Sequence, residues 1–315
     1  MNRRDFLATS LGATAAGALP IFAATNRIDR SRVSAITDEV AHSEEESIAF
    51  AKKFDLQWLS LRDIPSAERV KTPYYSLEGD ELKKAVRAFK DAGIRISFLD
   101  TPFLKFGLPG TEAVRKTPEQ PDAREKRIAR EKMQFDARLD DLRKGIRAAH
   151  AFDCTQVRFF AFNRVAEPES LFPRIAEIVA EMADIAQKEG ISLLIENEYS
   201  QNVGTSLETA KFMKLMPQKN VGINWDSLNG VNLGEKPYPD GYETLPKERI
   251  HNIHVKGKSL LDYPEHLDWT AILRSLDRDG FTGRLELETH ISGDQQIPSS
   301  HASMAEILRL LGTQG

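Results

Sequence analysis

The segment ISLLIENE at residues 191–198 decides the fold, because three later segments repeat its pattern. Each is a short run of mostly apolar residues that ends near a carboxylate or an imidazole: NVGINWDS (220–227), RIHNIHVKG (249–257) and GRLELETH (283–290). Such runs are typical of β-strands. The gaps between their candidate metal ligands are 30, 28 and 34 positions, for Glu196, Asp226, His254 and Glu288. A (β/α)8 barrel uses about 30 residues for each βα unit.

Four earlier segments have the same character: RVSAITDE (32–39), LQWLSLRD (56–63), IRISFLDTP (94–102) and TQVRFFAF (155–162). Between and after the strands the pattern predicts helices over 43–54, 82–92, 171–189 and 297–311. Strands that alternate with helices indicate parallel βαβ units. We therefore predict an α/β fold, a (β/α)8 TIM barrel that forms a single domain over residues 30–315.

Two aspects of this organisation leave alternatives open. An open doubly wound sheet has a similar pattern, but the first strand ends in TDEVAHSEEES, without the glycine-rich phosphate turn that usually follows there. The charged stretch 109–135 is predicted to be an extended loop that runs into a long helix. It is interpreted either as a lid over the rim of the barrel or as a solvated helix face.

The composition is that of a globular protein. The chain has 315 residues, of which 41% are hydrophobic and 29% charged, with a net charge of −4. This charge provides no basic surface, so we expect no nucleic-acid partner. Cys154 is the single cysteine, which excludes an internal disulfide. The sequence leaves the oligomeric state open.

Residues 1–24 are predicted to be an export signal. Arg3-Arg4 followed by Phe6-Leu7 resembles a twin-arginine signal, and the apolar run over 11–24 is too short to span a bilayer. We expect the Tat machinery to export the protein to the periplasm, with no membrane contact once the signal is removed. An ordinary uncleaved terminus is the alternative.

Strand alternation gives the candidate ligands a common direction. In ISLLIENE, Leu193 and Ile195 face the surrounding helices, so Glu196 points into the barrel. The same alternation directs a further set inward: Asn224, Asp226, Asn252, His254, Lys256, Arg284, Glu286 and Glu288.

Carboxylates brought close together raise one another's pKa unless a cation neutralises them. A set of oxygen ligands with one imidazole suits Mn²⁺ or Mg²⁺ and is compatible with Co²⁺ or Zn²⁺. We therefore expect one divalent metal. For any single carboxylate, the alternative is a salt bridge with Arg158, Lys256 or Arg284.

The segments IENE, GINWDSLN, IHVKGK and GFTGRLELET resemble the strand-end motifs of the sugar phosphate isomerase/epimerase superfamily, the xylose isomerase-like TIM barrels. The resemblance covers most of the chain after the signal, and the register of its last motif favours Glu288 over Glu286 as a ligand. It implies one divalent metal held by Glu196, Asp226, His254 and Glu288. It also implies that Glu196 and Glu288 move protons as base and acid.

Two positions depart from the family pattern. Gly257 replaces a frequent Asp, and Asn229 replaces a His that many members carry. The endonuclease branch of the superfamily needs such additional ligands for a cluster of metals, so we do not expect DNA cleavage.

Several residues are assigned to the substrate. Lys256 and Arg158 point inward and are predicted to bind its oxygens. Asp38, Glu39 and Arg62, at the ends of the first two strands, are predicted rim contacts or else a structural ion pair.

Other residues near the predicted rim are considered for a role in the site. Lys105 and Phe103 are interpreted as closing over a sugar or as ordinary surface residues. His251 is expected to pack outside the barrel mouth. His266 and His290 can approach the rim, but we assign them no role.

We expect a metal-dependent isomerase or epimerase that acts on a small-molecule sugar. A proton leaves the carbon next to a carbonyl, giving an enediolate. Export disfavours a phosphorylated substrate. Two alternatives remain: a lyase that performs β-elimination on an oxidised keto-glycoside with the same site, and a non-catalytic sugar-binding barrel.

Overall fold

Eight parallel strands form the centre of the molecule in the computed structural model, which describes residues 28–68, 70–256 and 267–312. All eight predicted strands are confirmed: β1 (Val33–Ala35), β2 (Trp58–Leu61), β3 (Arg95–Phe103), β4 (Gln156–Phe159), β5 (Ser192–Glu196), β6 (Val221–Asp226), β7 (Ile250–Lys256) and β8 (Arg284–Glu288). Neighbours pair in the order β1-β8-β7-β6-β5-β4-β3-β2. A parallel bridge between Ile36 and Ser60 joins β1 to β2 and closes the ring. The fold is therefore a single-domain (β/α)8 barrel.

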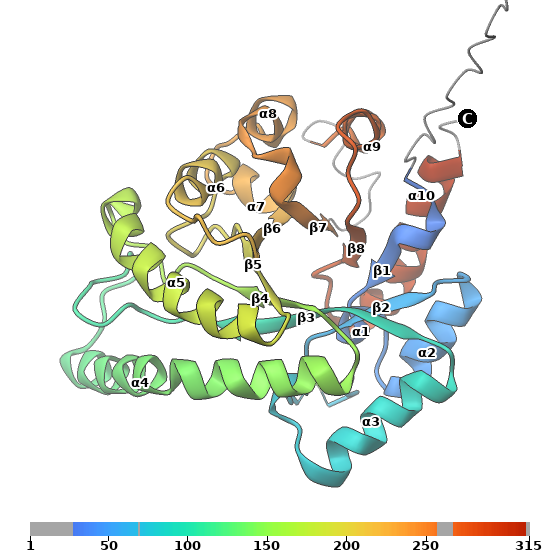
Figure 1. The fold of residues 1–315 in the computed structure, drawn as a ribbon, viewed down its shortest axis with the longest axis horizontal. Helices are drawn as coiled ribbons and strands as arrows, with labels where there is room; N and C mark the ends of the chain where they lie inside the picture. The colour runs from blue at the N-terminus through green and yellow to red at the C-terminus, as the bar shows by residue number, and fades with distance from the viewer. Residues whose placement is uncertain (1–27, 69, 257–266, 313–315) are drawn as a thin grey trace, which may run out of the picture.

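Helices surround the strands, as Figure 1 shows. In the described residues the helices are α1 (Thr37–Val40), α2 (Glu44–Lys53), α3 (Gly79–Asp91), α4 (Pro121–Ala151), α5 (Phe172–Lys188), α6 (Ser206–Met213), α7 (Ser227–Val231), α8 (Tyr242–Thr244), α9 (Trp269–Arg278) and α10 (Gln296–Gly312). Short 3-10 helices are η1 (Arg30–Arg32), η2 (Tyr74–Ser76), η3 (Pro168–Leu171), η5 (Lys247–Arg249) and η6 (Gly293–Gln295), and η4 (Pro237–Gly241) is a π-helical turn. The four predicted helices correspond to α2, α3, α5 and α10.

The hydrophobic core lies between the barrel and its helices. Leu193, Ile195, Trp225, Ile253 and Leu285 are at 0% exposure on the outward faces of β5, β6, β7 and β8. Their polar neighbours in sequence therefore point into the barrel, as the alternation predicts. The same packing that stabilises the strands thus fixes the direction of the candidate ligands.

The first strand is shorter than predicted. β1 ends at Ala35, and Asp38 and Glu39 lie in α1 instead of at the end of a strand. Ile36 caps this helix, and the two acidic residues fall in its first turn, where the helix dipole favours negative charge.

The structure does not support the interpretation of 109–135 as a lid, because no residue of this stretch lines the cavity at the candidate ligands. Arg127 is buried and pairs with Glu112, Glu119 and Glu131, which fastens the loop to α4. The blue-green loop and the green end of α4 extend past the strands in Figure 1. A groove of about 550 Å³ between this loop and α4 contains none of the candidate ligands. The solvated helix face is the alternative that agrees with the largely exposed residues of this stretch.

Gly283 lets β8 start close against β7. A Cβ added there would lie 2.1 Å from the carbonyl oxygen of His251, a backbone atom that cannot easily move away. We expect Gly283→Ala to lower the free energy of unfolding by about 1–3 kcal/mol, measured by urea denaturation. Gly312→Ala in α10 is the control, because an added Cβ there meets nothing within 4 Å. Equal stability of the two variants would contradict the close approach of the strands.

Candidate metal centre and active site

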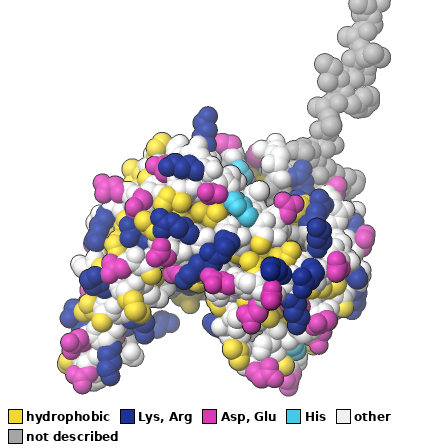
Figure 2. All heavy atoms as spheres, turned by 60° about the horizontal axis from the view of Figure 1, so that its bottom comes forward, with side chains coloured by type: hydrophobic (Ala, Val, Ile, Leu, Met, Phe, Trp, Pro, Cys, Tyr) yellow, Lys and Arg dark blue, Asp and Glu magenta, His cyan; other side chains and the backbone are white. Residues whose placement is uncertain are grey.

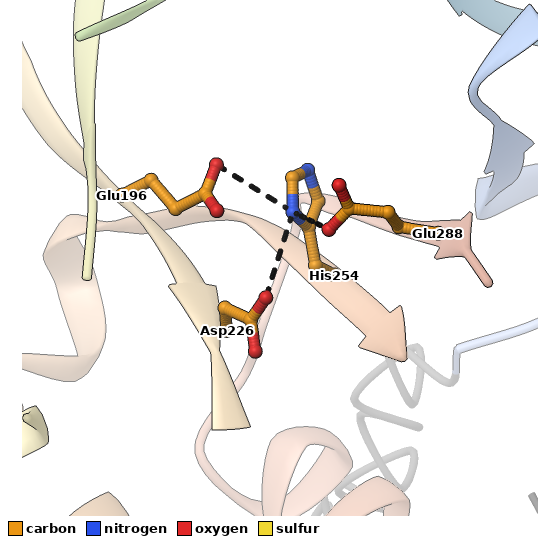
Figure 3. A group of neighbouring side chains, drawn as sticks. All are labelled: Glu196, Asp226, His254 and Glu288. Carbon is orange, nitrogen blue, oxygen red and sulfur yellow. Dashed lines mark ion pairs between the residues drawn. The ribbon is translucent and has the colours of Figure 1, made fainter. Parts of the chain in front are cut away.

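Four side chains from neighbouring strands converge at one end of the barrel. Each offers one ligand atom, and these atoms all lie within 4.8 Å of one another, for Glu196, Asp226, His254 and Glu288. All four residues are buried. Figure 3 shows the two glutamates approaching the imidazole from opposite sides, with the aspartate beside it. The cluster that the sequence predicts is therefore assembled by β5, β6, β7 and β8.

His254 turns Nδ1 toward the three carboxylates. This nitrogen lies 3.0 Å from Glu288 Oε2, 3.6 Å from Glu196 Oε2 and 4.0 Å from Asp226 Oδ2. Nδ1 and Glu288 Oε2 are buried, and neither makes a hydrogen bond within the described part of the chain. Buried polar atoms without partners are costly. Converging oxygen and nitrogen atoms without hydrogen bonds fit a divalent cation.

Backbone contacts hold the aspartate in place. Asn197 donates from Nδ2 to the carbonyl of Asp226 at 2.7 Å and accepts from its N–H at 2.8 Å. Asp226 also caps α7, since its Oδ1 accepts from Asn229 N at 2.9 Å. The amide of Asn229, which replaces the family's frequent His, donates to the carbonyl of Asn197 at 2.9 Å. The loops after β5 and β6 are thus locked together around the cluster.

Three basic residues balance the buried negative charge. Lys256 Nζ lies 2.8 Å from Asp226 Oδ2 and 3.1 Å from Glu288 Oε2. Arg158 Nη1 lies 2.7 Å from Glu196 Oε2, and Arg62 Nη1 lies 3.0 Å from Glu288 Oε1. The salt bridges considered as the alternative to a metal therefore exist for Lys256 and Arg158.

The pKa values of the cluster follow from burial opposed by these charges. Burial acts to raise the pKa of Glu196, but Arg158 and His254 outweigh it and bring the pKa below its ordinary value. Burial dominates at Asp226, whose pKa is raised even though Lys256 lies beside it. Burial acts to lower the pKa of His254, but Glu196 and Glu288 hold it well above its ordinary value. A metal and a proton would therefore compete for Nδ1.

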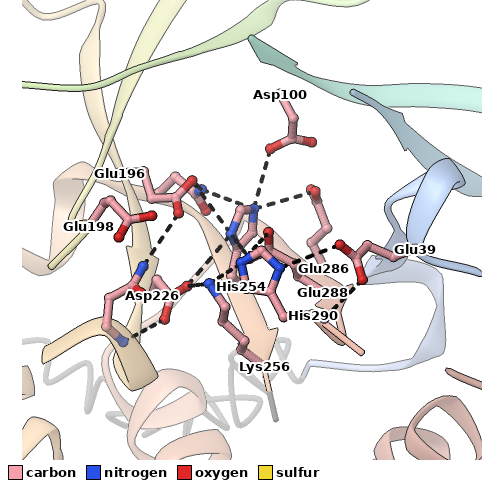
Figure 4. Close-up of polar contacts among 12 residues, drawn as sticks. Glu39, Asp100, Glu196, Glu198, Asp226, His254, Lys256, Glu286, Glu288 and His290 are labelled. Atoms are coloured by element: carbon pink, nitrogen blue, oxygen red, sulfur yellow. Dashed lines mark hydrogen bonds and ion pairs between the residues drawn. The ribbon is translucent and has the colours of Figure 1, made fainter. Parts of the chain in front are cut away.

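The other side of the His254 ring faces a second set of buried polar groups. Nε2 lies 3.4 Å from Asp100 Oδ1, 3.5 Å from Glu286 Oε1 and 3.0 Å from Asn224 Nδ2. Figure 4 shows Asp100 and Glu286 approaching the imidazole on this side. Burial, followed by the charge of Asp100, raises the pKa of Glu286 to about 8. Glu286 and Glu288, the two inward-facing glutamates of β8, thus approach different nitrogens of His254. Glu286 lies near Nε2, and Glu288 lies near Nδ1.

Asp100 was not singled out from the sequence, and an irregularity in β3 explains why. Ser97 and Asp100 both reach the barrel interior, where Ser97 Oγ contacts Ser34 Oγ and Asp100 contacts His254. Strict alternation cannot turn two residues three positions apart to the same face. The register between β2 and β3 shifts after Leu59, which supplies the extra residue.

His290 and Glu39 are nearer to the cluster than the sequence predicts. His290 Nε2 lies 3.5 Å from Glu288 Oε1, and its Nδ1 lies 3.6 Å from Glu39 Oε1. Arg62 links Glu39 to Asp38, with Nη2 at 2.5 Å from Glu39 Oε1 and 2.7 Å from Asp38 Oδ2. The sequence signal for His290 was its position two residues after Glu288, at the end of β8.

A cavity of about 540 Å³ opens onto this end of the barrel. Its charged lining includes Asp38, Arg62, Asp100, Arg158, Glu196 and Glu288, and its apolar lining includes Ile64, Val70, Pro73, Pro102 and Ile291. Lys105 also lines it, with Nζ 3.1 Å from Glu198 Oε2. Figure 2 shows that Lys and Arg side chains alternate with Asp and Glu over one face of the molecule, without an area of a single sign.

Other predicted residues lie away from the cavity. Phe103 packs on Tyr75 with ring centroids 5.0 Å apart, so its assignment to a sugar-closing loop is wrong. Arg284 stacks on Trp58 at 3.9 Å and does not pair with the cluster. His251 lies beside Gly222 at the start of β7, outside the mouth as expected. Gly257 and His266 lie outside the described residues.

The sequence profile of the Xylose isomerase-like TIM barrel family matches residues 48–311. The chain belongs to this family. The profile of twin-arginine translocation pathway signals matches residues 1–20, which indicates export by that pathway. The predicted signal boundary at residue 24 lies outside the described residues. No curated protein matches the sequence.

Solved structures share the fold at low sequence identity. A xylose isomerase-like TIM barrel protein from Mycobacterium smegmatis, in complex with magnesium, is 19% identical with a TM-score of 0.61, covering 89% of this chain and 96% of its own. A 3-keto-D-glucoside 4-epimerase from E. coli is 12% identical with a TM-score of 0.63, and the match covers 88% of this chain and 98% of the epimerase. A D-allulose 3-epimerase from Methylomonas sp., in complex with D-allulose, is 13% identical with a TM-score of 0.64. This match covers 90% of this chain and 98% of the epimerase. At these identities the likeness establishes the fold alone.

A search of the described helices finds none that is both long enough and apolar enough to cross a membrane.

Lys256 is expected to compensate the negative charge of the cluster when no metal is bound. Lys256→Met removes the cation beside Asp226 and Glu288, so we expect a loss of about 3–5 kcal/mol in the free energy of unfolding without metal. Mn²⁺ should restore part of this loss and should stabilise the variant more than the wild type. Chemical denaturation with and without Mn²⁺ measures both effects.

The matched control is Lys83→Met, which removes the exposed pair with Asp80 at 3.1 Å. An exposed pair contributes about 0–1 kcal/mol. A Lys256 variant that behaves like this control, with no added response to Mn²⁺, would show that the cluster does not need a cation.

Proposed function

We propose that the protein is a divalent-metal-dependent sugar isomerase or epimerase. The observation that carries this proposal is the convergence of Glu196, Asp226, His254 and Glu288, whose ligand atoms lie within 4.8 Å of one another. Two of these buried atoms, His254 Nδ1 and Glu288 Oε2, make no hydrogen bond within the described residues, and Glu196 and Glu288 line the cavity. Membership of the family and the epimerases among the structural neighbours support it. Mn²⁺ or Mg²⁺ is the proposed ion, because the donor set is mostly oxygen.

The reaction begins with removal of a proton from the carbon next to a carbonyl. A divalent ion bound to the cluster would act as a Lewis acid and favour the resulting enediolate. Glu196 and Glu288 approach from β5 and β8 on two sides of the imidazole, as Figure 3 shows. One glutamate takes the proton and the other returns one to the opposite face, which inverts the carbon.

The surrounding cations orient the two glutamates. Each nitrogen of Arg158 contacts a protein oxygen: Nη1 donates to Glu196 Oε2 at 2.7 Å, Nε to the carbonyl of Thr101 at 3.1 Å and Nη2 to the carbonyl of Asp100 at 2.8 Å. It therefore holds Glu196 in one position. Lys256 Nζ contacts Glu288 Oε2 and Arg62 Nη1 contacts Glu288 Oε1, and these contacts hold Glu288 in one position. We propose that Lys256, Arg158, Arg62 and Asp38 also contact substrate oxygens, because Lys256 and Arg158 face the cluster and the other two line the cavity.

A second candidate is β-elimination on a keto-glycoside. The cavity volume of about 540 Å³ lies in the range of about 300–1,000 Å³ that accommodates drug-sized ligands, and its outer wall is partly apolar. A glycoside would place its sugar at the charged floor and its aglycone against that wall. After proton removal, the electron pair forms a carbon–carbon double bond and breaks the bond to the glycosidic oxygen. The aglycone leaves as an alcohol after it gains a proton.

The twin-arginine signal favours a periplasmic location and a substrate without phosphate. We propose that the protein meets free or oxidised sugars outside the cytoplasm. The mixed charge of the face in Figure 2 agrees with a small-molecule substrate and with the absence of a nucleic-acid partner.

Deuterium exchange tests the proposed function. Mn²⁺-loaded protein in D₂O is incubated with D-allulose, D-fructose and a nitrophenyl 3-keto-glucoside, and NMR identifies the carbon that gains deuterium. We expect exchange at a single carbon next to the carbonyl of at least one probe. Glu196→Gln and Glu288→Gln should each reduce it by about 10²–10⁴-fold, because each removes a group that transfers protons.

Glu177→Gln, on the exposed face of α5, is the control and should leave exchange unchanged. Released nitrophenol identifies the lyase, and an epimer without nitrophenol identifies the epimerase. Absence of exchange from every probe in a protein that binds Mn²⁺ would favour the non-catalytic sugar-binding barrel.

A further inference from the structure

The imidazole of His254 lies between two sets of buried groups, and only one set belongs to the candidate metal centre. Its Nδ1 faces Glu196, Asp226 and Glu288, and its Nε2 faces Asp100 and Glu286, as Figure 4 shows. A histidine that binds a metal through one ring nitrogen carries its proton on the other. The group that accepts the Nε2 proton therefore decides whether Nδ1 is available.

Both oxygens of Glu286 already accept a hydrogen bond. Its Oε1 accepts from Ser60 Oγ at 2.7 Å, and its Oε2 accepts from Asn252 Nδ2 at 2.9 Å. Asp100 differs, because neither of its buried oxygens accepts a hydrogen bond from the described residues. Asp100 Oδ1 lies 3.4 Å from Nε2, about as close as Glu286 Oε1 at 3.5 Å.

Asn224 competes for the same nitrogen. Its Nδ2 lies 3.0 Å from His254 Nε2, and its Oδ1 accepts from Asn252 Nδ2 at 3.0 Å, which orients the amide. A hydrogen bond from Asn224 requires an Nε2 without a proton. It would leave the proton of a neutral imidazole on Nδ1, where it blocks metal binding.

We propose that Asp100 is a positioning residue for the metal centre: its carboxylate accepts the proton on Nε2 of His254 and leaves Nδ1 free to bind the ion. This inference rests on the proposed function, since it requires a metal at the cluster. Arg158 keeps Asp100 in place, with Nη1 3.2 Å from its Oδ1 and Nη2 donating to its carbonyl at 2.8 Å. The pair thus links β3 and β4 to the ligand on β7.

Metal affinity provides the first test, by calorimetric titration of the protein with Mn²⁺. Asp100→Leu removes the acceptor, and we expect a loss of affinity of about 10–100-fold, the usual effect of losing a group that orients a metal ligand. Asp100→Asn retains an acceptor oxygen and should recover part of the affinity. Glu286→Gln is the matched comparison on the same side of the ring, and we expect a smaller loss of affinity there than in Asp100→Leu.

Asp100→Leu also removes the 3.2 Å contact between Asp100 Oδ1 and Arg158 Nη1. The hydrogen bonds from Arg158 to the carbonyls of Asp100 and Thr101 use backbone atoms and persist in the variants, so Arg158 stays in place. Wild-type affinity in Asp100→Leu, or an equal loss in Glu286→Gln, would overturn the inference. If the wild type binds no Mn²⁺, the proposed function fails, and this inference fails with it.

The position of the proton provides a second readout that a purely structural role would not change. The protein is labelled with ¹⁵N-histidine and loaded with Mg²⁺, and the His254 signals are assigned by comparison with His254→Gln. We expect a protonated Nε2 and an unprotonated Nδ1 in the wild type, and a weakened Nε2–H signal in Asp100→Leu. A proton on Nδ1 in the metal-loaded wild type would overturn the inference.

Discussion

Three carboxylates and an imidazole share a small volume from which the barrel excludes most water, and their charges must be balanced there. Glu196, Asp226 and Glu288 surround His254 Nδ1 with all donor atoms within 4.8 Å. Isolated charges are costly in such surroundings, so each carboxylate needs a nearby cation. Arg158, Lys256 and Arg62 supply three cations, yet Nδ1 and one oxygen of Glu288 remain without hydrogen bonds among the described residues. A divalent cation would satisfy what these side chains leave unsatisfied.

The barrel is what makes this arrangement possible. The four candidate ligands lie far apart in sequence, and parallel strands bring their carboxyl ends together. Apolar residues on the outer faces of the same strands pack against the helices and fix the inward direction of the ligands. The loops after β5 and β6 add a second constraint, because Asn197 makes two hydrogen bonds to the backbone of Asp226. Fold stability and site geometry therefore depend on the same residues.

Much of this could be predicted from the sequence, since a period of two and regular spacing determine strands and the face of each residue. Glu196, Asp226 and His254 follow from this pattern, while the family resemblance is what favours Glu288 over Glu286. Alternation predicts which side chains point into the barrel but not how deep each one lies along its axis. It therefore did not show that Glu286 would lie on the other side of His254 from Glu288.

The remaining differences come from local irregularities and from contacts between residues far apart in the sequence. Asp100 became visible only with the shift of register between β2 and β3. Asp38 and Glu39 fall in a helix because β1 ends at Ala35. The contact of Glu39 with His290 joins residues at the two ends of the barrel sequence, and no local pattern reports it.

The central claim is that the buried cluster is a metal centre, and anomalous diffraction from crystals grown with Mn²⁺ tests it most directly. The account predicts one strong anomalous peak per chain, in contact with Glu196, Asp226, Glu288 and Nδ1 of His254. It also predicts that Lys256 will be farther from Asp226 than the present 2.8 Å, because the ion takes over part of its role. A map without a peak at this position, with Lys256 still bridging Asp226 and Glu288, would contradict the account.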